Sequence, residues 1–126
     1  MAWALGPSPR RIGPVRHRCG RSDWCRTRRM IIITGSAQVR SDELGEAVRL
    51  SLEHVNRSRL EPGCLLHSVH HDVEDANRLV FVEHWADADA VRAHFAVPAS
   101  RAFSKALAAL CEASSIELYD ATEVRL

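Results

Sequence analysis

The sequence has no long apolar run. No stretch of the 126 residues approaches the roughly 20 apolar residues of a membrane-spanning helix. The first 29 residues also contain no apolar segment of the roughly 7–15 residues that a secretory signal needs. We therefore expect a protein that has no membrane segment and stays in the cytoplasm.

Cysteines are few, and their spacing does not suit cross-links or structural zinc. Cys19 and Cys25 are separated by five residues, outside the usual zinc-ribbon spacing, and Cys64 and Cys111 lie far apart in the chain. Without a secretory signal, free thiols in a reducing compartment are the expectation. A phosphate-binding loop is missing too, because Thr34-Gly35-Ser36 holds a lone glycine. These absences argue against disulfide-rich, zinc-ribbon and nucleotide-dependent proteins.

Charge divides the chain at Met30. Residues 1–29 hold eight arginines against a single acid, Asp23, with three of the five prolines and three of the six glycines. Residues 30–126 instead hold nine basic residues against fifteen acidic ones. The composition predicts a basic, disordered leader over 1–29, which translation beginning at Met30 would explain. A natural extension, a targeting segment and a nucleic-acid-binding arm are the alternatives, and we expect no nucleic-acid partner.

Apolar periodicity from Met30 onward predicts an alternation of strands and helices. The predicted strands span 30–39, 64–73, 78–85 and 115–124, and the predicted helices span 42–60, 87–95 and 98–111. Ser41 and Asp87 are the expected N-caps, and Glu61-Pro62-Gly63 ends the first helix. The short polar link 74–77 makes an antiparallel hairpin of the second and third strands.

The order β-α-β-β-α-β predicts an α+β, ferredoxin-like domain with its helices on one face of an antiparallel sheet. Alternation along the second strand divides its side chains between two faces: Cys64, Leu66, Ser68 and His70 on one, and Leu65, His67, Val69 and His71 on the other. Apolar side chains on both faces need cover on both, and the helices of one chain cover only one. A second copy is the simplest cover, so we expect a homodimer.

Three short segments carry a resemblance to a known family. They are Glu61-Pro62-Gly63-Cys64-Leu65, Phe81-Val82-Glu83-His84-Trp85, and Ala93-His94-Phe95 with Pro98 four residues past the histidine. With them, residues 30–126 resemble the antibiotic biosynthesis monooxygenase family, small quinol monooxygenases included. The resemblance implies a dimeric α+β barrel and oxidation of a small aromatic substrate by O₂ without metal or flavin. The family also includes haem-degrading enzymes, isomerases and members without known activity.

The chain departs from the pattern of two branches of that family. Quinol monooxygenase relatives usually carry a second histidine directly after the proline, where this chain has Ala99-Ser100. The haem-degrading branch uses an asparagine on the first strand and an iron-ligating histidine in the last helix, where Ser36 and Phe103-Ser104 stand here. Because haem iron needs that axial ligand, haem is disfavoured and no cofactor is expected.

The expected catalytic residues are two histidines, a tryptophan and a glutamate. Oxygen insertion without a cofactor needs a phenolic anion that itself reduces O₂, so the protein must remove a proton and exclude water. A neutral imidazole suits that base, because the ordinary pKa of histidine is about 6.5. We expect His94 and His67 as bases, Trp85 as an aromatic wall and Glu83 as an orienting or ion-pairing group. Trp85 as core filler and Glu83 as a simple partner of an arginine are the structural alternatives.

A histidine-rich strand raises the question of a metal. On a strand, His70 points away from His67 and His71, so three ligands do not converge and we expect no metal site. His70 and His71 are interpreted as polar strand or subunit contacts, and Cys64 as a small buried residue.

The leading hypothesis is a cofactor-independent monooxygenase that oxidises a quinol or an aromatic polyketide-like molecule with O₂. One alternative is a small-molecule isomerase of the same fold, and the other is a non-enzymatic dimeric ligand-binding or stress-response protein. The missing second histidine, at Ala99-Ser100, adds weight to both.

Overall fold

A computed structural model describes residues 28–126, so the leader prediction for residues 1–29 lies almost wholly outside the described residues. The elements are β1 (Arg29–Val39), the short 3₁₀ helix η2 (Ser41–Glu43), α1 (Leu44–Ser58), β2 (Cys64–His71), β3 (Arg78–Trp85), α2 (Ala88–Ala96), α3 (Pro98–Leu110) and β4 (Cys111–Thr122). The strands form one antiparallel sheet in the order β2-β3-β1-β4. The predicted α+β, ferredoxin-like order of elements is confirmed.

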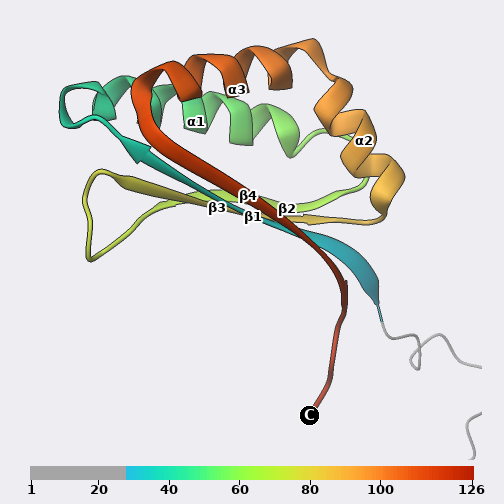
Figure 1. Ribbon diagram of the computed structural model, residues 1–126. Helices are drawn as coiled ribbons and strands as arrows, with labels where there is room; N and C mark the ends of the chain where they lie inside the picture. The colour runs from blue at the N-terminus through green and yellow to red at the C-terminus, as the bar shows by residue number, and fades with distance from the viewer. Residues whose placement is uncertain (1–27) are drawn as a thin grey trace, which may run out of the picture.

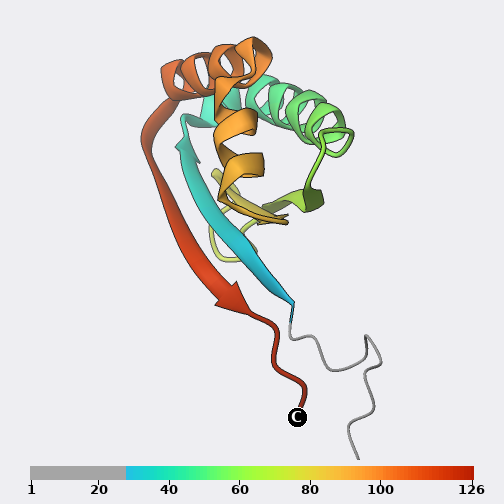
Figure 2. The same cartoon turned by 90° about the vertical axis from the view of Figure 1, so that its right-hand side faces the viewer.

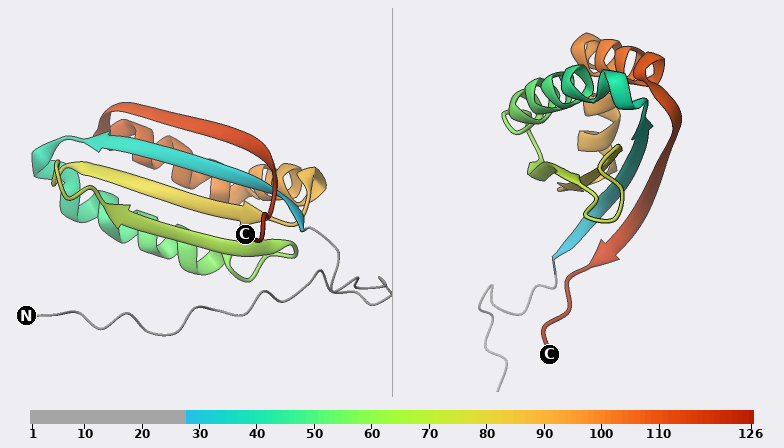
Figure 3. Two further views of the ribbon diagram at one scale, coloured as in Figure 1. Left: turned by 90° about the horizontal axis from the view of Figure 1, so that it is seen from below. Right: turned by 90° about the vertical axis from the view of Figure 1, so that its left-hand side faces the viewer.

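The three helices lie on the same side of the sheet (Figure 1). Seen from below, the four strands lie in front of the helices, and no helix covers the near face of the sheet (Figure 3). α1 and α3 run alongside each other (Figure 2). α2 points from these helices towards the sheet and contacts both α3 and β3. Among residues 28–126, helices therefore cover one face of the sheet and leave the other open.

Local sequence signals explain most of the element ends. Asp87 caps α2 as predicted, because its side chain accepts a hydrogen bond from the Ala90 N–H at 2.8 Å. Pro98 is the first residue of α3. A backbone N–H at that position has no partner within the helix, so proline loses no hydrogen bond there. The prediction that Ser41 caps the first helix is wrong: Ser41 begins η2, and α1 starts at Leu44 without a side-chain cap.

The bounds of β2 and β4 differ most from the predicted ones. β2 ends at His71 rather than at residue 73, because Asp72 turns the chain by accepting from the Glu74 N–H at 2.9 Å and from Arg78 Nη1 at 2.7 Å. β4 begins at Cys111 rather than at residue 115, directly after α3. Neither difference changes which elements meet at the site.

A bulge in β2 reverses the predicted face of Cys64. Cys64 pairs with Trp85 and Leu66 pairs with His84, so the intervening residue Leu65 has no partner of its own on β3. Beyond the bulge the alternation is regular and places His67 beside Glu83 on the helix-covered face. Cys64 shares that face with His67, whereas simple alternation predicted opposite faces.

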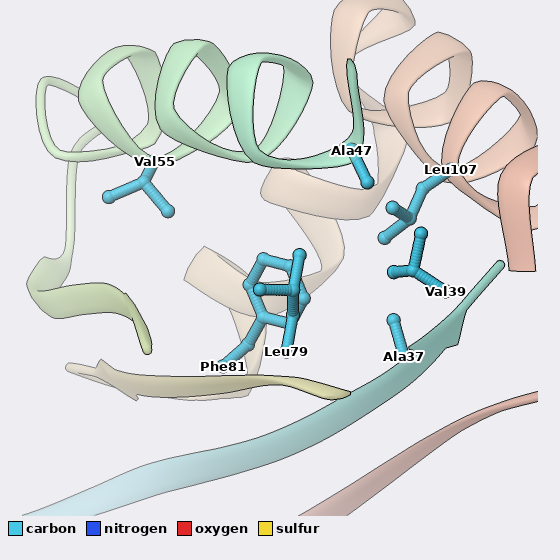
Figure 4. Packing of buried hydrophobic residues seen from close by; sticks show 7 residues of the cluster. All are labelled: Ala37, Val39, Ala47, Val55, Leu79, Phe81 and Leu107. Carbon is cyan, nitrogen blue, oxygen red and sulfur yellow. The ribbon is translucent and has the colours of Figure 1, made fainter. Parts of the chain in front are cut away.

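The core has two apolar clusters on the helix-covered face. The larger lies among α1, α3, β1 and β3 (Figure 4) and consists of Ala37, Val39, Ala47, Val55, Leu79, Phe81 and Leu107. The smaller consists of Ile33, Trp85 and Val91. Along β3 the inward side chains run from Phe81 in the first cluster through Glu83 to Trp85 in the second, so a polar group interrupts the core at Glu83.

Gly63 forms the tight turn between α1 and β2. Its φ of 83° lies in the left-handed region, and a Cβ built there would come 2.6 Å from Ala90 Cβ. Gly63→Ala should therefore lower the free energy of unfolding by about 2–3 kcal/mol, through backbone strain and the clash with α2. Urea denaturation measures this.

Gly45 provides the matched control, since it lies in α1, where a Cβ would meet no atom of the described chain within 4 Å besides its own helix backbone and chain neighbours. Gly45→Ala should leave the stability unchanged or raise it by up to about 1 kcal/mol, because alanine favours the helix. Equal destabilisation by the two substitutions would contradict the account of Gly63.

Within residues 28–126, no helix has both the length and the apolar character needed to cross a membrane. The two cysteines of this part of the chain, Cys64 and Cys111, are free thiols.

Candidate functional site

A cavity of about 510 Å³ opens between the helices and the sheet. Its lining includes His54, Glu83, His94, Phe95, Ser100 and Phe103. Aromatic walls with a few polar groups are typical of a site for a small organic molecule, and so is this volume.

Three imidazoles from three elements meet at the inner end of this site. His54 comes from α1, His67 from β2 and His94 from α2, and each has a ring nitrogen within 4.8 Å of nitrogens of the other two. Their exposed fractions are only 6%, 2% and 3%. The structure thus brings the two predicted bases, His67 and His94, together and adds His54, which the sequence analysis did not single out.

His94 is held by a carboxylate. Its Nδ1 lies 2.8 Å from Glu61 Oε2, and Arg57 Nη1 donates to the other oxygen of Glu61, also at 2.8 Å. A carboxylate paired with a guanidinium only accepts, so the proton of a neutral His94 sits on Nδ1. The lone pair of Nε2 remains without a partner among the described residues, on a side chain that lines the cavity.

His54 has the opposite arrangement of protons. Arg57 Nη2 lies 3.0 Å from His54 Nδ1, and a guanidinium has no acceptor, so Nδ1 accepts and Nε2 carries the proton. The ring stacks on Phe103 at a centroid distance of 3.9 Å and an angle of 7°. Burial lowers the pKa of His54 to about 3, and the charges of His67, His94 and Arg57 act in the same direction. His54 is therefore neutral at physiological pH.

His67 and Glu83 lie side by side on β2 and β3. The imidazole is fully buried, and neither ring nitrogen has a hydrogen-bond partner among residues 28–126. Its Nε2 is 3.4 Å from Glu83 Oε1, which is too poorly directed for a hydrogen bond. Burial lowers the pKa of His67 to about 4 and raises the pKa of Glu83. Glu83 lines the cavity, whereas His67 lies behind the lining.

Trp85 also lies behind the cavity lining. Its side chain is fully buried, and its Nε1 donates to Glu83 Oε2 at 2.7 Å. Its ring packs against His94 with a centroid distance of 4.6 Å. Trp85 thus supports the two predicted site residues that do line the cavity, Glu83 and His94, and its role as a wall for the substrate stays a prediction.

Ser100, the second residue after Pro98, belongs to the same network. Its exposed fraction is 4%, and its hydroxyl accepts from Arg57 Nη2 at 2.9 Å and lies 3.5 Å from His94 Nδ1. Arg57, Glu61 and Ser100 were missed by the sequence analysis. The available signal is the spacing of His54 and Arg57, at i and i+3 on α1, with Glu61 following in the turn directly after the helix.

Clustered imidazoles are ligands for zinc and copper, which raises again the question of a metal. Of His67, His70 and His71, which follow one another closely in the sequence, only His67 belongs to the observed cluster. His54 fits a cation poorly, because Arg57 occupies its Nδ1, leaves its Nε2 protonated and adds positive charge 3.0 Å away. A ligand must offer a free lone pair, so the cluster provides two imidazole ligands rather than three.

The chain is similar to known proteins over its described part. The profile of the antibiotic biosynthesis monooxygenase family matches residues 30–106. The uncharacterized protein sll1783 of Synechocystis sp. is 30% identical over 96 residues, which cover 75% of this chain but only 65% of that protein.

Solved structures of similar fold include a Deinococcus radiodurans protein described as a candidate antibiotic biosynthesis monooxygenase. It has a TM-score of 0.74 and is 26% identical in sequence. The match covers 77% of this chain and 97% of the Deinococcus radiodurans chain. Another antibiotic biosynthesis monooxygenase structure has a TM-score of 0.69 and 25% identity, covering 73% of this chain and 98% of its own. A Nitrosomonas europaea protein with the same description as the first has a TM-score of 0.70, covering 76% of this chain and 92% of its own, and at 18% identity shows likeness of fold alone.

The family match runs from β1 into α3 and includes the polar network of the site, from His54 to Ser100, while the part of the cavity lining from Leu107 to Ile116 lies beyond it. It covers well over half of the chain. By sequence and by fold, the chain belongs to the antibiotic biosynthesis monooxygenase family.

Proposed function

We propose that this protein is a cofactor-independent monooxygenase that oxidises a quinol or another electron-rich phenol with O₂. The observation that carries the proposal is His94, a buried imidazole on the wall of a cavity sized for a small aromatic molecule, with Nδ1 held by Glu61 and Nε2 unpartnered. Such a group takes the phenolic proton, and the anion that results is the reductant for O₂.

The surroundings of His94 suit that chemistry. Glu61 stabilises the imidazolium that forms when His94 accepts a proton, since the two groups are 2.8 Å apart. Phe81, Phe95 and Phe103 give the cavity aromatic walls, against which a planar substrate stacks and from which water is excluded.

Oxygen uptake with a panel of quinols tests the proposal. We expect consumption of one O₂ per substrate, with one atom of ¹⁸O₂ in the product and the other in water, and no effect of EDTA. Mass spectrometry of the product separates this from simple oxidation to a quinone, which incorporates no ¹⁸O. Loss of activity with a chelator, or uptake without incorporation, would contradict the proposal.

An isomerase is the second candidate, favoured by the pairing of one protonated and one unprotonated imidazole nitrogen on the cavity wall (His54 and His94). Proton transfer within a small carbonyl compound needs such a pair and no O₂. Turnover under strictly anaerobic conditions would favour this candidate over the monooxygenase. Turnover that no cavity variant alters would favour a non-enzymatic ligand-binding protein.

We also propose that a second copy covers the open face of the sheet. This face carries Ile32, Leu66, Val80, Val82 and Tyr119, of which Leu66 is 40% and Tyr119 50% exposed. Sedimentation equilibrium at micromolar concentration should give about twice the chain mass of 14.1 kDa.

Leu66→Asp should weaken this homodimer, because it places a charge in the proposed interface. Leu60→Asp is the control, since Leu60 is 87% exposed in the turn after α1 and should leave the dimer intact. A wild-type monomer at these concentrations would contradict the proposed assembly.

A further inference from the structure

One ion pair contacts both imidazoles on the cavity wall. Arg57 donates to Glu61 through Nη1 at 2.8 Å and contacts His54 Nδ1 through Nη2 at 3.0 Å. The second oxygen of Glu61 lies 2.8 Å from His94 Nδ1. Because the guanidinium only donates and the carboxylate only accepts, the pair imposes opposite tautomers on the two rings. His54 keeps its proton on Nε2, and His94 keeps its proton on Nδ1.

We propose that His54 and His94 form a binding site for a single phenol or enol oxygen, in which His94 Nε2 accepts the hydroxyl proton while His54 Nε2–H donates to the oxygen. His54 is thus the donor, and Arg57 and Glu61 are positioning residues. This assignment rests on the proposed function in one respect, namely that the substrate carries a hydroxyl group.

The spacing of the two rings suits one shared oxygen. Their centroids are 5.3 Å apart, and ring nitrogens of the two lie within 4.8 Å of each other. Two hydrogen bonds of about 2.8 Å to a common oxygen span up to about 5.6 Å, so an oxygen between the rings reaches both. If both rings had the same tautomer, the two Nε2 atoms would be two donors or two acceptors. Neither arrangement can remove the proton of a hydroxyl group and also donate a hydrogen bond to its oxygen.

The proton transfer is balanced within the site. The substrate O–H bond breaks, its electron pair stays on the oxygen, and the proton forms an N–H bond at His94 Nε2. The imidazolium remains paired with Glu61, and the new oxyanion is held by the Nε2–H of His54. Stacking on Phe103 and the Arg57 contact fix the His54 ring, so its donor is oriented before the charge develops.

Tautomers are measured directly by ¹⁵N NMR of the full chain labelled at histidine, with no substrate present. We expect His54 as the Nε2–H form and His94 as the Nδ1–H form, assigned by the loss of each set of peaks in His54→Gln and His94→Gln. Arg57→Met removes the donor to His54 and should let this ring sample both forms. Equal tautomers for the two rings, or an unchanged His54 spectrum in Arg57→Met, would overturn the inference.

Binding of p-nitrophenol provides the second arm, because its anion absorbs near 400 nm. His54→Phe preserves the ring that stacks on Phe103 but removes the N–H, and should weaken binding of the phenolate about 10-fold or more. His54→Gln retains a donor and should restore part of the affinity. His71→Phe, at the exposed end of β2, is the control and should bind like the wild type.

Equal affinity of His54→Phe and the wild type would overturn the donor role of His54. If neither protein binds p-nitrophenol at millimolar concentration, the proposed phenol-oxidising function fails, and the ¹⁵N spectra decide the tautomer assignment independently.

Discussion

Replacing His94 by alanine is expected to lower turnover of an active quinol by about 10²–10⁴-fold, the usual contribution of one acid–base group. The imidazole is the group on the cavity wall that offers a lone pair backed by a carboxylate, through Nδ1 and Glu61. Without it the substrate must ionise unaided, while binding by the aromatic walls persists. The loss should therefore appear in kcat more than in KM, measured with an oxygen electrode.

Packing around His94 requires a companion variant. The side chain is 3% exposed and lies against Trp85, so alanine leaves a cavity as well as an unpaired Glu61 oxygen. His94→Gln fills more of the space and donates to Glu61, but its amide is no base. Both variants should lose turnover, and the glutamine variant should retain a melting temperature close to that of the wild type.

His71→Ala is the control for the loss of an imidazole, since His71 is exposed at the end of β2 and should leave turnover unchanged. Full activity in His94→Gln would assign the base to His67 or to ionisation of the substrate itself.

Periodicity was sufficient to predict the order of the elements. Amphipathic helices and β-branched strands differ in their repeat, and short polar links separate them, so the β-α-β-β-α-β order follows from local signals. Pro98 and Asp87 marked helix ends for stereochemical reasons that hold in most contexts. Ser41 is not the cap because it begins a 3₁₀ turn, Ser41–Glu43, that precedes α1.

The register near Cys64 could not be obtained from alternation. A bulge inserts one residue into β2, and nothing in the identity of Leu65 announces it. The bulge places both Cys64 and His67 on the face that the helices cover, where Cys64 packs against the cluster of Ile33, Trp85 and Val91. A strictly regular strand carries only one of them there.

The histidine cluster was only half predictable for a related reason. Alternation relates only residues of the same strand. It places His70 on the opposite face from His67 and His71, so it predicts no site at which three imidazoles meet. The observed partners of His67 come instead from α1 and α2, and their distances depend on how these helices pack on the sheet. The hydrogen-bond roles of His54 and His94 depend on Arg57 and Glu61, which only the folded chain brings into contact with both rings.

Mild acid is expected to destabilise the protein strongly. Burial lowers the pKa of His54 to about 3 and that of His67 to about 4, below the value of about 6.5 in an unfolded chain. Below pH 6.5 the unfolded chain therefore binds more protons than the folded protein, so stability falls as the pH falls. At pH 5 each histidine contributes a loss of about 2 kcal/mol, or about 4 kcal/mol together.

The groups that face these two imidazoles do not offset this loss. Arg57 contacts His54, and Arg59 donates to the carbonyl oxygen of His67 at 2.9 Å. The centroid of the His94 ring lies 5.3 Å from that of His54 and 5.8 Å from that of His67. Glu83 is the acid nearest to His67, but burial raises the pKa of its own carboxyl, which weakens it as a counter-ion. Glu61 already pairs with Arg57 and His94.

Urea denaturation at pH 7, 6 and 5 measures this loss, and His67→Gln separates the two contributions. Glutamine cannot gain a proton, so the variant should lose only about half as much stability as the wild type between pH 7 and pH 5. His71→Gln should keep the full dependence, because His71 is exposed at the end of β2, away from the histidine cluster. An unchanged dependence in His67→Gln would mean that His67 is protonated in the folded protein without penalty. Glu83, 3.4 Å away, would then act as a full buried counter-ion, although burial raises the pKa of its carboxyl.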